Sequence, residues 1–499
     1  MAYAVDNISI EGISIELLEK LELHCKPFEH GIVTFSGYVN AETGEQLIYR
    51  VQEQSQITVL AGGKKIFCGM ITAMKVCGKG NTSYVEVEGK TYSMLMDQKK
   101  KSRSFQNVTM TYKELATEIL SEYAGAQILF SMPDVAIGEI AIQYRETDWQ
   151  FLKRMLSMQH IPITCVPTAD TIQLYAGVLP IPSKKLSYQT IGFRKELGEY
   201  QYWLQEGVAV RDDNFLMVEI ETKEILELFE QVEVAGQTLV VAEILYQFKE
   251  GLLSCICKLQ KTKGILAKKE YPMHLIGVAL EGEVKEVSGI QVKIHLGIDG
   301  NRPSEDVYWF PFSTLSASQD GSGWYYMPEI GDKVRVYFPT KYTKDVIAIG
   351  AVSSYDGTNR KEPDRMSDPS TKYLRNPSGQ EIKMGEDITY QLYQNGLLIV
   401  SGSGETYHFK DTTELYEHIK ENLCCVTRNE VYERWFHQIR EILIFSEITE
   451  IGDYALSNLW YMEKIVIIPT SIKVGEKTFD GLGNYAKQDT VWNVDLSEK

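Results

Sequence analysis

Histidine is scarce in this sequence, and its cysteines lack the spacing that zinc sites need. None of the eight histidines stands in an H-E-x-x-H or H-x-E…C-x-x-C arrangement, which excludes the motifs of zinc hydrolases and deaminases. Cys255 and Cys257, two apart in LLSCICKL, are expected to be buried on one strand face. The cysteines form no C-x-x-C pair; they are Cys25, Cys68, Cys77, Cys165, Cys255, Cys257, Cys424 and Cys425. This usage suits a reducing cytoplasm and predicts no disulfide framework, metal or cofactor.

Long apolar runs are also absent. A membrane-spanning helix needs roughly 18 consecutive apolar residues, whereas the runs here are short, as in LLIV at 397–400. The first thirty residues mix apolar and acidic side chains and have neither a basic n-region nor an uninterrupted apolar h-region. We therefore expect no transmembrane segment, no secretory signal, and synthesis and assembly in the cytoplasm.

Positive charge is in deficit, because 51 lysines and arginines face 68 aspartates and glutamates, for a net charge of -17. Proteins that bind phosphate backbones carry clustered lysine and arginine, so this balance argues against a nucleic-acid partner. The one basic cluster, KKKSR at 99–103, is interpreted as a solvated face at a strand end.

Catalytic motifs are missing as well. The sequence has no G-x-S-x-G, no P-loop and no G-x-G-x-x-G after a strand, and SGSGE at 401–405 lacks the lysine of a phosphate cradle. Five residues near the C-terminus are of the types that build metal or acid–base sites, but neighbours on a helix point apart, so we interpret them as solvated helix faces: His408, Asp411, Glu417, His418 and His437. We expect a protein that is not an enzyme.

The segments that are present indicate several β-rich domains. Short strand-like runs fill residues 1–95 and return at 186–265, where VEVAGQTLVVAEIL at 232–245 echoes ITVLAGGKKIFCGMI at 57–71. The echo predicts two related β-barrels that flank a different domain at 96–185.

The intervening domain is predicted to be α/β. Thr111 with Glu114, and Thr147 with Gln150, form capping boxes that start two amphipathic helices. Trp149 and the apolar residues that follow it at helical spacing are interpreted as core, and Pro162 stops the second helix.

Residues 270–352 predict a small barrel of the OB type. IQVKIHLG and KVRVYF alternate apolar and polar residues, so one face of each strand is buried. The Pro- and Ser-rich segment 353–372 is the best linker, and strands follow at 373–405.

The segment 406–499 differs in composition. Helices are expected at 408–423 and 428–444, and IGDYAL at 451–456 recurs as VGEKTF at 474–479, a 23-residue period typical of stacked units. Only about two units are visible, so we expect a capped fragment or one that packs on the helices. The repeat-like positions are Ile451, Gly452, Ala455, Pro469, Gly475 and Phe479.

Two strings carry a resemblance to a known family. The first is E-T-D-W-x-F-L-x-R, with Glu146, Thr147, Asp148, Trp149, Phe151, Leu152 and Arg154. The second is P-x-x-G-D-x-V-x-V-x-F with its flanks, formed by Trp324, Pro328, Gly331, Asp332, Val334, Val336, Phe338 and Gly350. On these strings, roughly residues 1–355 resemble the phage late-control gene D and VgrG family of tail hub–spike proteins. The C-terminal repeat is similar to leucine-rich repeats of the BspA type.

The resemblance implies a mainly β, multidomain chain: two hub β-barrels around an α/β domain, an OB barrel, a short β spike segment and an α plus leucine-rich-repeat-like extension. It implies a homotrimer in the baseplate or tip of a contractile injection particle, delivered outward on contraction. The implied partners are a hexameric inner-tube protein, baseplate components, a PAAR-type tip protein and effector cargo bound at or fused to the extension. Two alternatives concern the extension: a fused toxin or cell-wall hydrolase, or a receptor- or adaptor-binding tail.

Overall fold

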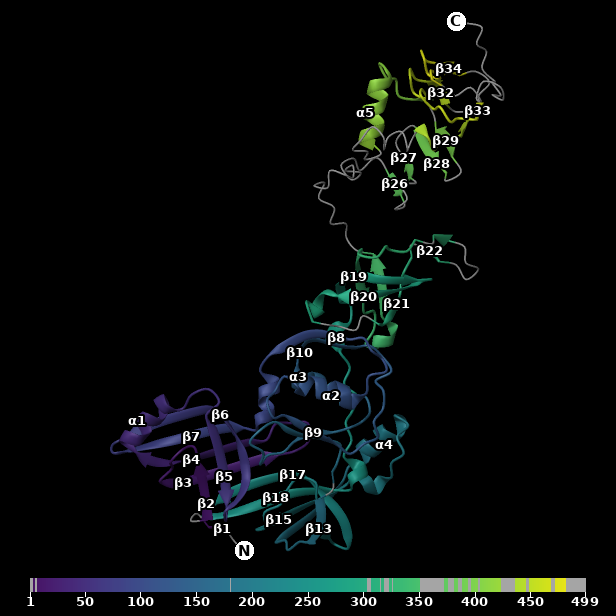
Figure 1. Cartoon of the computed structure of the whole chain (residues 1–499). Coiled ribbons are helices and arrows are strands. Elements are labelled where there is room, and N and C mark those ends of the chain that lie inside the picture. Colours follow the sequence, from purple (N-terminus) through teal and green to yellow (C-terminus); the bar gives the residue numbers. More distant parts are fainter. Residues whose placement is uncertain are drawn as a thin grey trace. The chain divides into compact units, whose positions relative to one another are not determined.

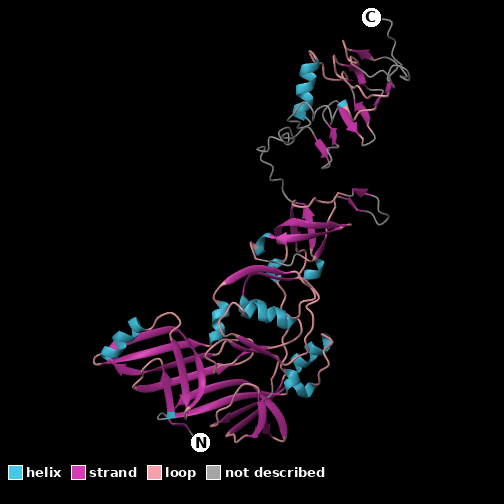
Figure 2. Cartoon of the chain, in the orientation of Figure 1, coloured by secondary structure: helices cyan, strands magenta, loops and turns pink. Residues whose placement is uncertain are grey.

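The chain is mainly β and divides into two compact units, Met1–Ala351 and Val352–Lys499 (Figures 1 and 2). The computed structural model describes residues 3–4, 7–179, 181–302, 307–314, 316–317, 323–324, 326–350, 372–375, 381–384, 388–393, 396–402, 404–422, 436–445, 448–467 and 472–481. Pro469, Cys424, Cys425 and the linker expected at 353–372 lie outside these residues, except for Lys372, which begins β26 (Lys372–Arg375). No helix among those described is long and apolar enough to cross a membrane.

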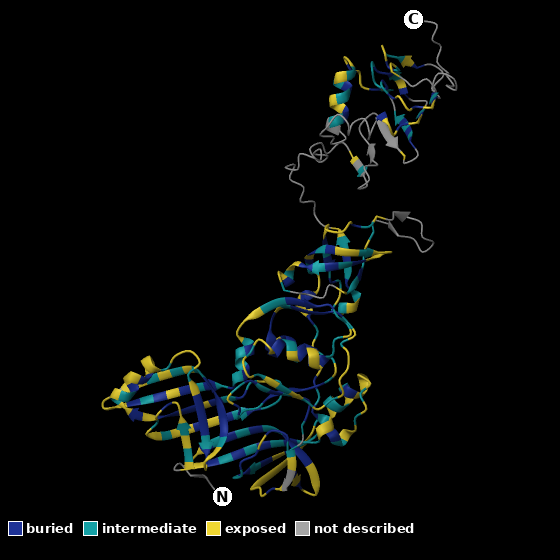
Figure 3. Ribbon diagram, in the orientation of Figure 1, coloured by how far each residue is buried: buried dark blue, intermediate teal, exposed yellow. Residues whose placement is uncertain are grey.

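One sheet of thirteen strands forms the base of the first unit, and its main path runs β14-β15-β18-β17-β3-β4-β7-β6-β5-β2. Alternate residues of its strands are buried, which gives the striped pattern of Figure 3. Its elements are β1 (Tyr3–Ala4), β2 (Ile8–Glu11), β3 (Leu17–Cys25), β4 (Ile32–Asn40), β5 (Gln56–Ala61), β6 (Lys64–Lys79), β7 (Thr82–Lys90), β13 (Ile181–Lys185), β14 (Thr190–Lys195), β15 (Leu216–Thr222), β16 (Glu230–Val234), β17 (Gln237–Lys249) and β18 (Leu252–Gln260), with α1 (Ala41–Arg50) and α4 (Leu197–Gln205) outside the sheet.

Two three-stranded meanders in this sheet share one plan. In β5-β6-β7 and in β16-β17-β18, a short strand leads through a two-residue turn to a long strand, and a second two-residue turn leads to a strand of nine residues. Gly63, Gly236 and Gly251 occupy these turns at positive φ, the conformation that tight hairpins require. The sequence echo is therefore a repeat of structure.

The two meanders are joined rather than separate, which corrects the expectation of two barrels. β3 pairs with β17, so hydrogen bonds between the backbones of these two strands connect the two halves of the sheet. Buried residues of both halves form one hydrophobic core, and the main path of the described strands is open.

The α/β domain predicted at 96–185 is built as the capping signals indicate, except that its last segment, β13, belongs to the thirteen-stranded sheet. Thr111 and Thr147 each cap a helix, and Glu114 and Gln150 complete both boxes. Trp149 is buried in the core of this domain, which confirms its interpretation. The second helix ends at Ser157, before Pro162. The elements are η2 (Tyr92–Asp97), β8 (Lys100–Phe105), α2 (Tyr112–Leu120), β9 (Gln127–Phe130), β10 (Ala141–Thr147), α3 (Asp148–Ser157), β11 (Ile163–Cys165) and β12 (Gln173–Ala176).

The end of the first unit is a five-stranded sheet of order β21-β20-β19-β24-β25. A parallel bridge between Phe312 and Ala348 brings its two outer strands together, the connection expected of an OB fold. Its strands are β19 (Ala279–Ser288), β20 (Gln291–Leu296), β21 (Trp309–Pro311), β24 (Lys333–Tyr337) and β25 (Ile347–Gly350), with the small pair β22 (Ser316–Ala317) and β23 (Gly323–Trp324) beside them in sequence.

The second unit contains a stack of short parallel strands. The 23-residue period is exact in the register, since Leu443 pairs with Val466 and Glu450 with Lys473. A third coil, beginning at β29, precedes these two, because β29 pairs in parallel with β31 and β30 with β32. The elements are β26 (Lys372–Arg375), β27 (Glu381–Met384), β28 (Ile388–Leu392), β29 (Leu397–Gly402), β30 (Gly404–Glu405), α5 (Thr412–Asn422), β31 (Glu441–Ile444), β32 (Ile448–Ile451), β33 (Lys464–Ile467) and β34 (Lys473–Val474).

Two expectations for this unit need correction. The helix predicted at 408–423 is α5, but the end of the one predicted at 428–444 is strand β31. The strands at 372–402 share a sheet with the extension, so the predicted boundary at residue 405 is crossed by paired strands.

Candidate functional site

The signature string of the α/β domain surrounds a buried ion pair. Arg154 donates from Nε and Nη2 to the two carboxylate oxygens of Glu146, at 2.8 Å each, and from Nη2 to the carbonyl of Ile142 at 2.7 Å. Both charged side chains are nearly buried. Such two-pronged contacts fix orientation, so this pair locks α3 onto β10.

A second buried charge, Asp148, lies at the start of the same helix. Its carboxylate accepts hydrogen bonds from Lys101 Nζ at 2.6 Å, Arg103 Nη2 at 2.8 Å, the Tyr123 hydroxyl at 2.7 Å and Gln143 Nε2 at 2.9 Å. Burial alone would raise the pKa of Asp148, but the hydrogen bonds from Lys101, Tyr123 and Gln143 hold it below its ordinary value.

The basic cluster at 99–103 is therefore not simply a solvated face, and that interpretation was wrong for two of its members. The Arg103 side chain is only 9% exposed and that of Lys101 19% exposed, because both are held against Asp148. The sequence showed the charges but not the buried partner, which lies on another element.

The apolar residues of the string complete this core. Trp149 packs against the ring of His30 at 4.5 Å between centroids, and Phe151 and Leu152 are fully buried. The seven signature residues thus serve the packing and the ion pairs of the α/β domain.

The OB signature likewise serves the fold. Val334, Val336 and Phe338 are buried in the core of the OB domain. Gly331, at φ 94°, turns the chain before β24, and Asp332 accepts a hydrogen bond from the Glu329 backbone at 2.8 Å. Pro328 is buried, Trp324 lies in β23 and Gly350 ends β25.

A contact that the sequence did not reveal joins the OB domain to the α/β domain. The buried Asp299 accepts hydrogen bonds from the backbone nitrogen and the hydroxyl of Ser104, both at 2.6 Å. Arg302 pairs with Glu118 beside it. These contacts link β8 and α2 to the loop after β20, so the two domains belong to one compact unit.

The five polar candidates of the second unit do not assemble. Asp411 caps α5 by accepting from Thr413 and Glu414, and Glu417 pairs with Lys420. His418 stacks on Tyr407, while His437 packs against Tyr461. His408 has three acidic neighbours, Glu405, Glu450 and Asp453. None of these three was among the predicted candidates, and the register of neighbouring coils is the signal that places Glu450 and Asp453 beside His408.

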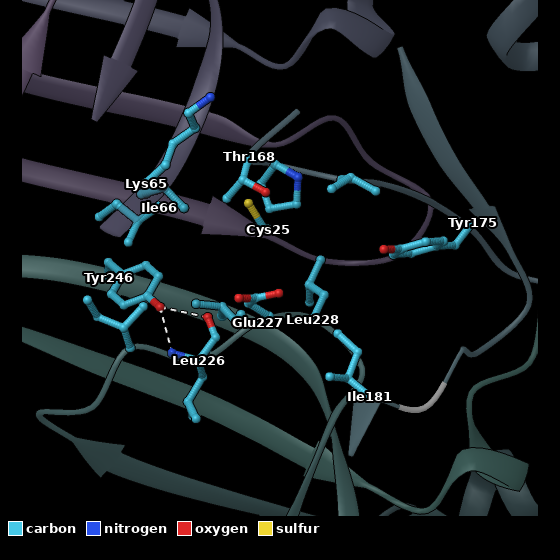
Figure 4. A pocket seen from close by; sticks show the side chains of 15 residues that line it. Cys25, Lys65, Ile66, Thr168, Tyr175, Ile181, Leu226, Glu227, Leu228 and Tyr246 are labelled. Atoms are coloured by element: carbon cyan, nitrogen blue, oxygen red, sulfur yellow. Dashed lines mark hydrogen bonds between the residues drawn. The ribbon is translucent and has the colours of Figure 1, made fainter. Parts of the chain in front are cut away.

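A cavity in the first unit lies between β3, β6, β12 and the segment 225–228 (Figure 4). Its reactive groups are occupied: the Tyr246 hydroxyl donates to the Leu226 carbonyl at 2.7 Å and accepts from its nitrogen at 2.9 Å. Burial raises the pKa of the Cys25 thiol well above its ordinary value, which keeps it protonated and unreactive. Most of the other side chains that line this cavity are apolar.

Comparison with known proteins bears on the first unit. Residues 41–167 match the family model of the phage tail baseplate hub (GPD). A solved Escherichia coli protein, described as a component of the type VI secretion system with structural similarity to the T4 bacteriophage tail proteins gp27 and gp5, has a TM-score of 0.51 and 12% identity; the match covers 68% of this chain and 98% of that one. At this identity the match shows a shared fold.

A structure of the Francisella PdpA–VgrG complex also matches, with a TM-score of 0.49 and 8% identity over 80% of this chain and 86% of that one. No curated protein matches the chain. The family model includes the first signature string at 146–154, which supports the resemblance to the hub–spike family for that part of the chain, whereas the second string at 324–350 lies outside the matched residues.

Proposed function

We propose that this chain, residues 41–167 of which belong to the phage tail baseplate hub (GPD) family, is a structural hub–spike protein of a phage tail or contractile injection system. The observation that carries the proposal is the pair of matching meanders in one sheet, with the α/β domain between them in sequence and an OB domain after them in the same unit. Its work is mechanical: a surrounding sheath supplies the force, and this chain transmits it.

The repeated meander supports a trimeric assembly. Three chains with two similar modules each present six similar modules, which suits docking of a threefold spike onto a hexameric inner tube. The outer strand β14 pairs with β15 alone among the described strands, and it exposes Ile191 and Phe193 to solvent. Apolar side chains on an unpaired sheet edge favour contact with another subunit.

Mass measurement tests this assembly. We expect light scattering to give three times 56.8 kDa for the purified chain, and a monomer at micromolar concentration would overturn the trimer. Recovery of baseplate, inner-tube and PAAR-type tip proteins with the particle, and their loss when this chain is deleted, would test its place between tube and tip.

The second unit has a second candidate function, the binding of a receptor, adaptor or effector cargo. Stacked parallel coils that expose Phe445, Trp460 and Tyr461 favour a binding surface over a catalytic one. The competing hypothesis is a fused toxin or cell-wall hydrolase.

Deletion of residues 372–499 distinguishes between these two hypotheses. The deletion begins at 372 because a cut at 405 would break the pairing of β29 with β31. Normal assembly without target killing, together with substrate turnover by the isolated segment, would favour a toxin. Binding of a partner by the segment without turnover would favour an adaptor.

A further inference from the structure

The repeat in the hub base is larger than the two meanders. Strands β3 to β7 follow one another along the chain and lie in the sheet in the order β5-β6-β7-β4-β3. Strands β14 to β18 also follow one another, and they lie in the order β16-β17-β18-β15-β14. Each strand of this first module (β3–β7) therefore has an equivalent in the second module (β14–β18), so that β3 corresponds to β14 and β6 to β17.

A bulge in the long strand of each module aligns the two modules residue by residue. The ladder between β6 and β7 skips Thr72, and the ladder between β17 and β18 skips Ala242. Both long strands end seven residues after this bulge. Val76 and Tyr246, each four residues after the bulge, are therefore equivalent.

The same alignment reaches the strands β3 and β14. The line of paired residues that starts directly before each bulge runs Ile71–Gly89–Val33–Leu23 in the first module and Val241–Leu259–Val218–Phe193 in the second. Phe193 therefore has the place of Leu23, and Ile191, two residues earlier, has the place of Leu21.

These equivalent positions differ in burial. Strand β3 lies between β4 and β17, and its Leu21 and Leu23 are 0% and 1% exposed. Strand β14 pairs with β15 alone among the described strands, and its Ile191 and Phe193 are 37% and 59% exposed. The second module thus carries the apolar residues of the first but lacks the neighbouring strand that covers them.

The equivalent of that neighbouring strand is β6, and β6 has an edge to offer. Strand β5 pairs with β6 only over Lys64–Met70, so no described strand pairs beyond Ile71 with the edge that faces away from β7. Strand β17 uses its corresponding edge, at Ile244–Phe248, to pair with β3. Helix α1 packs across β4, β7 and β6, so it lies on the face of the sheet and not along this edge.

The strands β14 and β6 of one chain stand too far apart to pair with each other. Six strands, β15, β18, β17, β3, β4 and β7, lie between them along the open path of the sheet. The pairing therefore needs a second copy of the chain.

We propose that β14 of one chain pairs antiparallel with β6 of the next chain in the trimer, as β3 pairs with β17 within a chain; this inference rests on the proposed hub function. The register of β3 with β17 then places Phe193 opposite Val76, Gly192 opposite Cys77 and Ile191 opposite Gly78. The contact is head-to-tail, so three chains close into one ring of six modules.

The residues brought together suit such a pairing. Val76 is partly buried and packs against the core of the hub base, and Phe193 lies on the same face of the sheet, opposite the buried Val218. A pair of one aromatic and one β-branched residue is favourable across antiparallel strands. Gly78 leaves room for Ile191, since a Cβ atom at Gly78 would have only the Ser83 hydroxyl within 4 Å.

The charges on the two strands are balanced within each chain. The proposed register places Arg194 opposite Lys75, and two like charges in this position repel. Arg194 lies 2.5 Å from Glu196, however, and Lys75 lies 3.2 Å from Glu86. The two carboxylates offset the repulsion, so the register joins two ion pairs.

A disulfide tests this register, because Cys77 is exposed and directly opposite residues of antiparallel strands lie within the reach of a disulfide. Gly192→Cys places a second thiol opposite Cys77, and a Cβ atom at Gly192 would have only the Glu219 carbonyl oxygen, at 3.9 Å, within 4 Å. Diamide takes two electrons and two protons from each pair of thiols. We expect the treated full-length variant to run on a non-reducing gel as covalent trimers, three times 56.8 kDa, and as single chains after reduction.

Matched variants check that the cross-link reports the proposed register. Gly192→Cys combined with Cys77→Ser should remain a single chain. Arg194→Cys places the thiol on the same face of β14, two residues away, and should cross-link at least 10-fold more slowly. Ile191→Cys with Gly78→Cys, in a chain that carries Cys77→Ser, is a second pair that should also give covalent trimers.

Light scattering of the same variants under reducing conditions separates failure of this pairing from failure of the trimer. A mass of three chains without cross-linking of either pair would overturn the pairing of β14 with β6 and leave the trimer standing. A mass of one chain would overturn both. Covalent dimers without trimers would indicate a twofold contact and would also overturn the ring.

Discussion

Leu23 of β3 lies directly opposite Tyr246 of β17, and this pairing makes a single sheet from the two halves of the hub base. The Tyr246 hydroxyl is held by the backbone of Leu226, so the junction is anchored from within the second half. One continuous sheet with one hydrophobic core packs the two modules into a single rigid body, as the proposed mechanical role requires. The α/β domain relies in addition on buried charges.

Asp148 is the residue of that domain whose loss should cost most. Asp148→Ala takes the buried partner from Arg103 and Lys101, which keep only the partly exposed Glu122, and breaking a buried ion pair by removing one partner lowers the free energy of unfolding by about 3–5 kcal/mol. Asp148→Asn keeps the shape of the side chain and should lower the free energy of unfolding by about 1–3 kcal/mol. Urea unfolding followed by far-ultraviolet circular dichroism measures both changes, with Glu42→Gln on the exposed side of α1 as a control near zero. If Asp148→Ala lowered the free energy of unfolding by less than about 1 kcal/mol, the proposed role of Asp148 would be contradicted.

The same carboxyl predicts how stability depends on pH. Because the hydrogen bonds to Asp148 hold its folded-state pKa below the ordinary value despite burial, its contribution is complete above the unfolded-state pKa of about 3.9. The contribution is lost as the pH falls from there through the folded-state pKa. Melting temperatures between pH 6 and pH 3 should therefore fall more steeply below about pH 4 in the native chain than in Asp148→Asn. Equal slopes would show that Asp148 is not a source of acid sensitivity.

The proposed trimer contact at β14 can be tested by introducing one charged side chain into it. Phe193 is 59% exposed on this outer strand, and Phe193→Glu would place a carboxylate in an apolar subunit contact. We expect the mass by light scattering to fall from three chains to one. Tyr49→Glu on α1 is the matched control, since Tyr49 is 83% exposed and should leave the mass unchanged. A stable trimer of Phe193→Glu would remove β14 from the interface.

Local signals predicted local structure well. Each capping box, at Thr111 and at Thr147, is contained within four consecutive residues, and each helix begins directly after its capping threonine. The contact between Arg103 and Asp148 joins residues on different elements, so no short pattern announced it. The same holds for Asp299 and Ser104, which lie 195 residues apart in the sequence.

The repeats of the second unit show why the rest was missed. Residues 441–444 follow a helix-like pattern, yet they form β31 because strands on both sides offer parallel partners. The first coil was not recognised because α5 lengthens it, so the 23-residue period begins only with the second coil. The cluster at His408 depends on that hidden coil and was out of reach for the same reason.

Gly452 provides the test of the stacked coils. It lies at the repeat position that Gly475 occupies one period later, and a Cβ atom at Gly452 would lie 2.2 Å from the Tyr407 carbonyl oxygen of the preceding coil. Since that neighbour is backbone, it cannot move aside without breaking the parallel register, and overpacking of this kind costs about 1–3 kcal/mol or more. We expect Gly452→Ala to lower the melting temperature of the isolated segment 372–499.

Gly198→Ala, in the full-length chain, is the control, because the new methyl group has open space around it and should leave the stability of the first unit unchanged or slightly raised. If the Gly452→Ala segment has the same melting temperature as the native segment, the coils do not stack closely at this position. The acidic side chains of the neighbouring coil would then not be held close to His408.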